Sequence, residues 1–289
     1  MRRRLNSWTI GDYIIALILV LIALSILIPV WYVIVVSLVP QHVYFQTRLL
    51  MFPHELTFAN YNHVFQSNLI RTGFMTTIFI TITGTLYALA LNVSFAYALL
   101  KPIPGRGIVW VLLLITMFIS GGLFPSFLMM VNLGFMNNRL AMVLPFGINI
   151  VWVFLLQAYM RTLSNEYEES ARLDGAGEMT ILIRIVLPLC KPILATVALF
   201  AAVGRWNEWF NGLMYMQFSN LWPLQLVLRE ILSNAGQLVQ GLPADARIVT
   251  FNIGIQMASV IVTMLPIVCV YPFLQRHFVK GIQLGGVKG

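Results

Sequence analysis

Long apolar stretches alternate with short polar segments along the whole chain of 289 residues. A helix needs about 20 mostly apolar residues to cross a bilayer, and six stretches come close to this length or exceed it. The pattern therefore predicts an all-α membrane protein, with a single transmembrane domain over residues 1–289. The six expected spans are residues 14–39, 72–100, 107–131, 140–160, 188–208 and 249–274.

The composition supports a polytopic membrane protein. Hydrophobic residues make up 59% of the chain and charged residues 10%, against about 45–50% and about 25% in soluble domains. The basic residues behind the net charge of +8 are scattered, so they do not indicate a nucleic-acid partner. Cys190 and Cys269 lie in or beside expected spans and indicate no disulfide framework. The apolar run that follows Arg2 is too long for a signal peptide and is expected to be a retained span.

The distribution of Lys and Arg predicts the orientation. Six spans place both termini on one side of the membrane. Twelve of the 18 basic residues fall on that side, in the N-terminus, the turn 101–106, the region 161–191 and the tail. Cytoplasmic segments carry an excess of Lys and Arg, so both termini and residues 161–191 are expected in the cytoplasm.

The longest charged stretch runs from Asn165 to Pro188 and reads as a helix, a turn and a second helix. Asn165 and Glu168 form a near capping box, and Gly175 stands where the first helix should end. Leu187-Pro188 is expected to redirect the chain into the fifth span. An apolar stripe for the second helix is predicted at Met179, Leu182, Ile183 and Val186.

This stretch resembles the docking motif of permease subunits in bacterial ATP-driven, binding-protein-dependent importers. That motif runs EAA, three residues, G, nine residues, I, one residue, LP, and here only Ser170 departs from it. The resemblance implies the type I importer permease fold, with coupling helices at 165–186 that fit a cleft on an ATP-hydrolysing subunit. The alternative is an ordinary amphipathic loop. The residues that the resemblance assigns to ATPase coupling are Glu169, Ser170, Ala171, Asp174, Gly175, Ile185, Leu187 and Pro188.

Several kinds of chemistry have no support in the sequence. The phosphate-binding signature G-x-x-x-x-G-K-[ST] does not occur, so the chain is expected to hold no cofactor, and ATP and Mg²⁺ would bind to separate partner subunits. The four histidines lack metal-ligand spacing, so neither a metal site nor a catalytic residue is expected. Five of the six expected spans carry no central carboxylate, which argues against ion-driven transport. The chain is expected to be a transport subunit, not an enzyme.

A second polar cluster lies near the outer end of the fifth span. Arg205 and Glu208 are a candidate ion pair, because their i, i+3 spacing makes them neighbours on one helix face. Trp206 and Trp209 are of the kind that stack on sugar rings, so one reading is a carbohydrate site. The other reading is an outer aromatic belt with snorkelling charges. The candidate residues for the substrate pathway are Arg205, Trp206, Asn207, Glu208, Trp209 and Asn211.

The whole chain is similar to the sugar branch of these importers, and looks like the second permease of maltose-type systems. It is closer still to the oligosaccharide and polysaccharide group with lipoprotein-type and alginate-type permeases. Three further stretches carry the resemblance: Ser120-Gly-Gly-Leu-Phe-Pro125, Trp222-Pro-Leu-Gln-Leu-Val-Leu-Arg-Glu230 and the ending Phe278-Val-Lys-Gly to Gly286-Val-Lys-Gly289.

The resemblance implies a complex in the bacterial cytoplasmic membrane that imports an oligosaccharide or polysaccharide by alternating access. Its other parts would be a similar second permease, two ATP-binding subunits and an extracytoplasmic solute-binding protein, which loops 40–71 and 209–251 would face. Two alternatives stay open. One is a permease for another solute, such as an amino acid or phosphate. The other is a membrane enzyme acting on a lipid-linked sugar, which would need clustered carboxylates at a membrane face.

Overall fold

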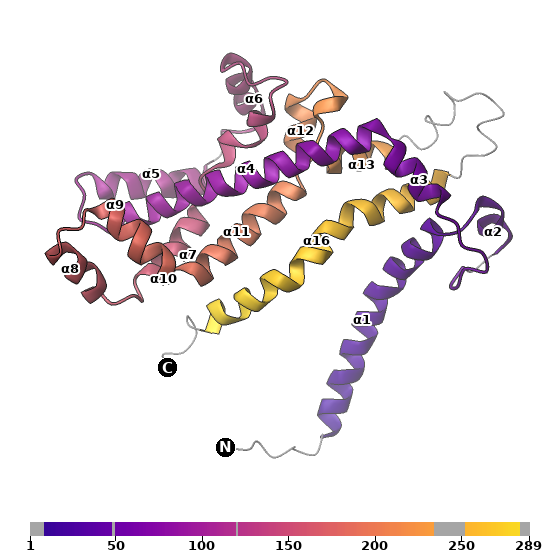
Figure 1. Ribbon diagram of the computed structural model, residues 1–289, viewed down its shortest axis with the longest axis horizontal. Coiled ribbons are helices and arrows are strands. Elements are labelled where there is room, and N and C mark those ends of the chain that lie inside the picture. The colour runs from indigo at the N-terminus through magenta and orange to yellow at the C-terminus, as the bar shows by residue number, and fades with distance from the viewer. Residues whose placement is uncertain (1–8, 48–49, 120, 234–251, 284–289) are drawn as a thin grey trace. The chain divides into compact units, whose positions relative to one another are not determined.

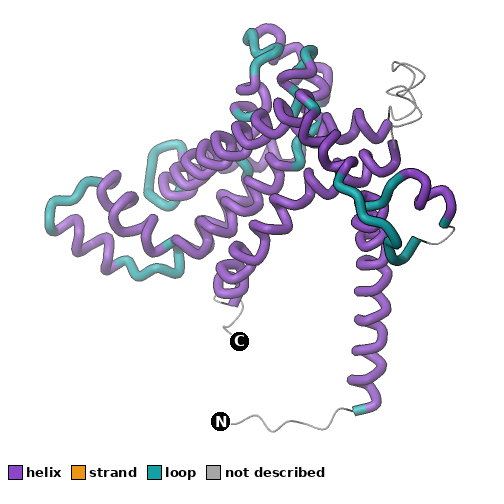
Figure 2. Tube along the Cα trace, turned by 45° about the vertical axis from the view of Figure 1, so that its right-hand side comes forward, coloured by secondary structure: helices purple, strands orange, loops and turns teal. Residues whose placement is uncertain are grey.

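The computed structural model describes residues 9–47, 50–119, 121–233 and 252–283, without the side chains of residues 252 and 271–283. Within these ranges every regular element is a helix, which confirms the all-α expectation (Figures 1 and 2). The chain forms two compact units, Met1–Ser67 with Glu230–Met264, and Asn68–Arg229 with Leu265–Gly289. The basic N-terminal residues, residues 234–251 of the loop 209–251 and the end of the tail, for which the sequence made predictions, lie outside the described residues.

The first unit contains α1 (Ile10–Ser37), α2 (Gln41–Gln46), α3 (Ala59–Gln66) and the first part of α16 (Asn252–Gln283). Almost every side chain of α1 is exposed, and only its last turn is buried, against Val39, Val43 and Leu50. Asn60 donates its side-chain N–H to the carbonyls of Ser37 and Val39, at 3.0 and 3.3 Å, and so satisfies groups left free where α1 ends. An apolar helix exposed on all sides is suited to lipid or to another membrane helix.

The second unit is built around α4 (Asn68–Ala98), which packs along α7 (Ile150–Met160) and α11 (Lys191–Trp206) (Figure 1). The apolar core between these helices includes Ala96, Leu156 and Val197, each almost fully buried. The other elements are α5 (Arg106–Phe118), α6 (Leu123–Asn132), η1 (Arg139–Met142), η2 (Leu144–Phe146), α8 (Glu166–Leu173), α9 (Glu178–Ile181), η3 (Leu182–Val186), α10 (Leu187–Leu189), α12 (Phe210–Tyr215), η4 (Ser219–Leu221) and α13 (Leu224–Ser233).

Three helices are long and apolar enough to cross a membrane: α1, α4 and the part of α16 from Ile253 to Val270. Three further stretches reach that length only as bent pairs, so the described residues hold up to six spans if each pair is counted as one. The stretch expected as the fourth span shows why. Pro145 has no backbone N–H, and the chain there forms η1 and η2, bends by 50° and continues as α7.

Candidate functional site

The charged stretch folds into α8, a turn at Gly175, and α9, at one end of the second unit (Figure 1). We call residues 165–189 the docking element. Gly175 has φ of 81°, a left-handed conformation that a glycine adopts without a Cβ penalty. The N–H of Gly175 reaches the carbonyl of Arg172 and that of Ala176 reaches Ala171, which closes the end of α8. Gly175 thus ends the first helix, as the sequence predicted.

The near capping box predicted at Asn165 and Glu168 does not form, so this prediction was wrong. Asn165 has helical backbone angles and its side chain caps nothing. Ser164 takes that place, because its Oγ accepts a hydrogen bond from the N–H of Glu166 at 3.3 Å. The carboxylate of Glu168 is drawn instead to Lys101, in the turn after α4, since a charged donor outcompetes a neutral backbone N–H.

Five side chains form a polar network that ties the docking element to the end of α4. Lys101 bonds Glu168 and lies 3.6 Å from Glu178. Arg172 bridges Glu168 at 3.2 Å and Glu178 at 2.8 Å, and so joins α8 to α9. Tyr97 donates its hydroxyl to Glu178 at 2.6 Å. This bond is the main effect that lowers the pKa of Glu178 below its usual value, and Lys101 and Arg172 act in the same direction.

The docking element has one buried face and one exposed apolar edge. Ile181, Leu182 and Val186 are buried in the core between α4 and α7. Four other apolar side chains of the element are exposed, among them Leu173 at 91% and Met179 at 69%. We call these four side chains the exposed edge: Tyr167, Leu173, Met179 and Ile183. Sequence reasoning did not single out this edge, although Leu173 beside the charged residues was a signal for it.

The predicted apolar stripe is split between these two faces. Leu182 and Val186 are buried as expected, whereas Met179 and Ile183 face outward. The cause is the geometry of η3, which is a π-helix over Leu182–Val186. A π-turn contains more residues than an α-turn, so an α-helical spacing counted through it places residues on the wrong face.

The residues assigned to ATPase coupling lie at different depths. Glu169 is exposed and forms no hydrogen bond or ion pair with another described side chain, so its carboxylate is accessible. Exposed with Glu169 are Ser170, Asp174, Gly175 and Pro188, while Ala171, Ile185 and Leu187 are half-buried. The role of these eight residues in coupling stays a prediction.

The chain leaves the docking element through a sharp bend. It turns by 84° at Cys190, between α10 and α11, two residues after the point predicted at Leu187-Pro188. Pro188 and Pro192 each lie in the first turn of a helix, where the missing N–H costs no helical hydrogen bond. The docking element is therefore directly continuous with the base of α11.

The second polar cluster does not form the expected ion pair. Arg205 is only 7% exposed, and it donates to the carbonyls of Met142 and Phe146, both at 2.7 Å. Glu208 instead accepts from the backbone and side-chain N–H groups of Asn211, at 3.0 and 2.8 Å. The reason is that α11 ends at Trp206, so Arg205 and Glu208 do not share a helix face.

The other members of this cluster also have separate partners. Trp206 lies edge-on to Phe74, and Trp209 lies under Arg229, whose guanidinium is 4.0 Å from the ring. Asn207 donates to the carbonyl of its own preceding turn. The structure thus gives these residues several local roles, and their part in a substrate pathway stays a prediction.

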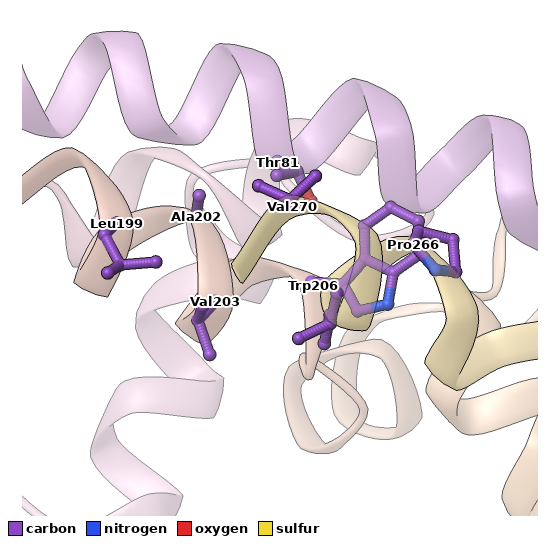
Figure 3. Close-up of a pocket in the computed structure, with 8 residues that line it drawn as sticks. Thr81, Leu199, Ala202, Val203, Trp206, Pro266 and Val270 are labelled. Carbon is purple, nitrogen blue, oxygen red and sulfur yellow. The ribbon is translucent and has the colours of Figure 1, made fainter. Parts of the chain in front are cut away.

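Trp206 borders a cleft of about 180 Å³ between α4, α11 and α16 (Figure 3). Its other lining residues are apolar apart from Thr81, whose buried hydroxyl has no hydrogen-bond partner among the described residues. The remaining lining residues are Leu199, Ala202, Val203, Pro266, Ile267 and Val270.

In the part of the chain that the structure describes, no group of three His, Cys, Asp or Glu side chains is placed to hold a metal ion.

Membrane-length apolar helices and a charged docking element between them are what a membrane transport subunit requires. The chain belongs to the family of binding-protein-dependent transport system inner membrane components, whose sequence profile matches residues 105–284. The match covers both the docking element and the Arg205 cluster. The chain is thus a transport permease of the ABC importer class and a membrane protein, not an enzyme.

Two relatives and one solved structure match nearly the whole chain. Protein LplC of Bacillus subtilis is 36% identical over 91% of this chain and 90% of its own length. The polygalacturonan/rhamnogalacturonan transport system permease YtcP of the same organism is 32% identical over 96% of this chain and 98% of its own. The crystal structure of a bacterial ABC transporter involved in the import of the acidic polysaccharide alginate contains a chain with a TM-score of 0.85 and 30% identity. That match covers 94% of this chain and 99% of the other.

Proposed function

We propose that this protein is the transmembrane subunit of an ATP-driven importer that moves an oligosaccharide or polysaccharide from an extracytoplasmic binding protein into the cytoplasm. The observation that carries the proposal is the docking element, which is fixed to α4 by the Lys101 network and is continuous with α11. Closure of two ATPase subunits would move this element and rock the attached spans, which gives alternating access.

In this proposal the chain crosses the membrane six times, with both termini in the cytoplasm. The distribution of Lys and Arg supports that orientation, and it places the docking element on the side where ATP is available. A similar second permease and two ATP-binding subunits complete the complex, and ATP and Mg²⁺ bind to the ATP-binding subunits. The extracytoplasmic binding protein delivers the sugar from the opposite side.

The exposed edge of the docking element is the surface proposed to meet the ATPase. Leu173 and Met179 supply apolar area that is otherwise left in water, and such exposed apolar residues commonly mark interfaces. The exposed carboxylate of Glu169 supplies a polar contact on the same element. The buried face of Ile181 and Val186 holds the element against the core, so that force applied at the edge reaches α11.

The substrate class rests on two relatives. The transport system named for polygalacturonan and rhamnogalacturonan and the structure of the alginate importer both concern acidic polysaccharides. An acidic oligosaccharide is therefore the first substrate to test.

A pull-down from detergent tests the docking step. The tagged chain is coexpressed with candidate permease and ATPase subunits of its own organism, and Leu173→Glu is compared with the unaltered protein. Phe218→Glu is the matched control, because Phe218 is also apolar and 59% exposed but lies outside the docking element. We expect Leu173→Glu to lose the ATPase and Phe218→Glu to retain it. Copurification of the ATPase with both variants would contradict the proposed docking surface.

An ATPase assay on the intact complex with its binding protein tests the substrate. Partial digests of polygalacturonan and of alginate are compared with neutral oligosaccharides, an amino-acid mixture and inorganic phosphate. Stimulation by an oligosaccharide supports the sugar assignment. Stimulation by amino acids or phosphate alone would replace it with a permease for another solute.

A further inference from the structure

The break between η2 and α7 is a non-helical segment inside a stretch long enough to cross a membrane. Residues 147–149 have no regular structure, and the two parts of the stretch meet at 50°. In a bilayer, backbone groups freed by such a break must be satisfied by the protein itself. Two buried side chains from different helices satisfy them here.

Arg205 reaches the break from α11. Its Nη1 donates to the carbonyl of Met142 at 2.7 Å, and its Nη2 donates to Phe146 at 2.7 Å and to Val143 at 3.5 Å. The guanidinium also lies 5.7 Å from the Phe146 ring. No carboxylate within the described chain forms an ion pair with Arg205. A guanidinium has five donors in a fixed geometry, so Arg205, buried and bonded to three carbonyls, specifies the position of the break.

Asn92 reaches the same break from α4. Its side-chain N–H donates to the carbonyl of Gly147 at 2.7 Å, and its Oδ1 accepts from the N–H of Asn149 at 2.9 Å. Asn92 is fully buried. The break is thus held from two sides, by α11 through Arg205 and by α4 through Asn92, and we call these two residues the clamp.

One glycine leaves space for the clamp and another leaves space beside the break. A Cβ at Gly84 of α4 would lie 3.0 Å from Nε of Arg205 and 3.2 Å from its Cδ, so the Arg205 side chain passes directly over Gly84. A Cβ at Gly147 would lie 2.5 Å from Cε1 of Tyr87, so the break packs directly against this side chain of α4.

We propose that Arg205 is a positioning residue that transmits movement of the docking element through α11 to the break and to α7. The inference rests on the proposed function and extends it. The docking element is joined by the chain itself to the end of α7 on one side and to α11 on the other. Arg205 lies 15 residues beyond Cys190, about 22 Å along α11. It joins the far end of α11 to the break that leads into the far end of α7. Because α7 and α11 are thus connected at both ends, they cannot slide past each other when the docking element moves.

The first test measures how many sugar molecules are imported for each ATP hydrolysed. The reconstituted complex carries Arg205→Met or Arg205→Lys, and the substrate is the oligosaccharide digest that stimulates the unaltered complex, at saturation. We expect Arg205→Met to lower this ratio about tenfold, within the range usual for coupling between distant sites, and Arg205→Lys to recover part of the loss.

Two other roles for Arg205 give different results in this assay. If Arg205 only stabilises the fold, uptake and ATP hydrolysis fall together and the ratio stays constant. If Arg205 binds the sugar, KM rises while the ratio at saturation is unchanged. Either result would overturn the proposal. An unaltered complex that no sugar stimulates would instead count against the proposed function.

The second test needs no substrate. Ile148 is exposed and lies in the break, so Ile148→Cys in a Cys269→Ser background places a single accessible thiol there, Cys190 being buried. We expect a non-hydrolysable ATP analogue to change the rate of maleimide labelling at position 148 in the complex. The response should be lost with Arg205→Met and retained with Arg205→Lys. A labelling rate that ignores nucleotide, or that responds equally in Arg205→Met, would overturn the proposal.

If the complex that carries Arg205→Met fails to assemble, Gly84→Ala is tested in its place. This change keeps the charge but forces the Arg205 side chain to shift by a few tenths of an ångström. We expect the ratio of sugar to ATP to fall about fivefold, at the low end of usual coupling effects. Gly204→Ala is the matched control, because a Cβ there has nothing within 4 Å. An unchanged ratio in Gly84→Ala would count against transmission through Arg205.

Discussion

The Lys101 network of the docking element and the clamp are both polar clusters that join three segments of the second unit, but they are built from different interactions. The Lys101 network pairs charges of both signs, with charged side chains that are 20% to 53% exposed. The clamp holds one buried guanidinium and one buried amide on backbone carbonyls and an N–H, with no opposite charge.

This difference indicates different mechanical roles. A partly exposed ion pair contributes about 0–1 kcal/mol, and its partners can exchange with little loss. Removing one partner of a buried hydrogen bond costs about 1–3 kcal/mol, and more for a charged group, because the remaining groups stay buried and unpaired. The docking element is therefore able to adjust as a partner binds, while the clamp keeps the break and α11 in a fixed relation.

The largest expected effect comes from a substitution at Gly175, which disrupts the turn of the docking element without changing a residue of the clamp. Gly175→Pro requires a φ near −65° at a position with φ of 81°, so the turn cannot form. We expect uptake by the reconstituted complex to be abolished while the protein still inserts into the membrane. Gly177→Pro is the matched control, because Gly177 already has φ of −74°. Normal uptake by Gly175→Pro would contradict the role of the turn.

The next largest effect is expected at the break. Gly147→Ala places a Cβ against Tyr87 and Leu91, and overpacking of this kind costs about 1–3 kcal/mol. Thermal unfolding of the purified protein in detergent measures the loss. Gly204→Ala has open space around the new Cβ and is expected to leave the unfolding temperature unchanged or raise it slightly. Equal unfolding temperatures for the two variants would show that the break is loosely packed.

A smaller effect is expected from acid on the docking element. The pKa of Glu178 is lowered in the folded protein from its usual 4.5. The stability that Glu178 contributes is therefore fully present above its usual pKa and is lost as the pH falls through the lowered value. We expect the unfolding temperature to fall between about pH 5 and pH 3 more steeply in the unaltered protein than in Glu178→Gln. Parallel curves would show that the network adds no stability.

The smallest effect is expected from salt, and it sharpens the contrast between the two clusters. Raising the ionic strength from 0.1 to 1 M shortens the Debye length from about 10 to about 3 Å, which weakens exposed pairs but not buried contacts. Lys101→Gln should lower stability by about 0.5 kcal/mol at low salt and by less at high salt. The loss caused by Arg205→Met should not change with salt. A salt-dependent loss at Arg205 would mean that water reaches the clamp.

Local features of the chain were predictable from the sequence. The apolar stretches follow from composition, and the left-handed turn follows from Gly175, because glycine tolerates positive φ. The docking motif and the permease class depended on spacing over twenty residues, which one sequence displays directly.

Contacts between distant segments were not predictable in this way. Lys101 is 67 residues from Glu168, and Arg205 is 59 residues from Phe146, so nothing in either local pattern shows that they meet. The expected pair of Arg205 and Glu208 assumed a helix that continues past Trp206, where α11 in fact ends. The bend at Cys190 was misplaced by two residues, because Pro188 reads as a break but fits the first turn of α10.

The π-turn at Leu182–Val186 has a consequence for the spacing of the docking motif. Nine residues separate Gly175 from Ile185, and this interval contains the surplus residue of the π-turn. Deleting one residue there would restore a regular α-helix and rotate everything before it by about 100° about the helix axis. Met179 would then turn away from the exposed edge although the element had kept nearly the same length. The spacing of the motif thus sets the rotation of the helix about its axis more than its length. Single-residue insertions or deletions in this interval should therefore be tolerated far less than substitutions.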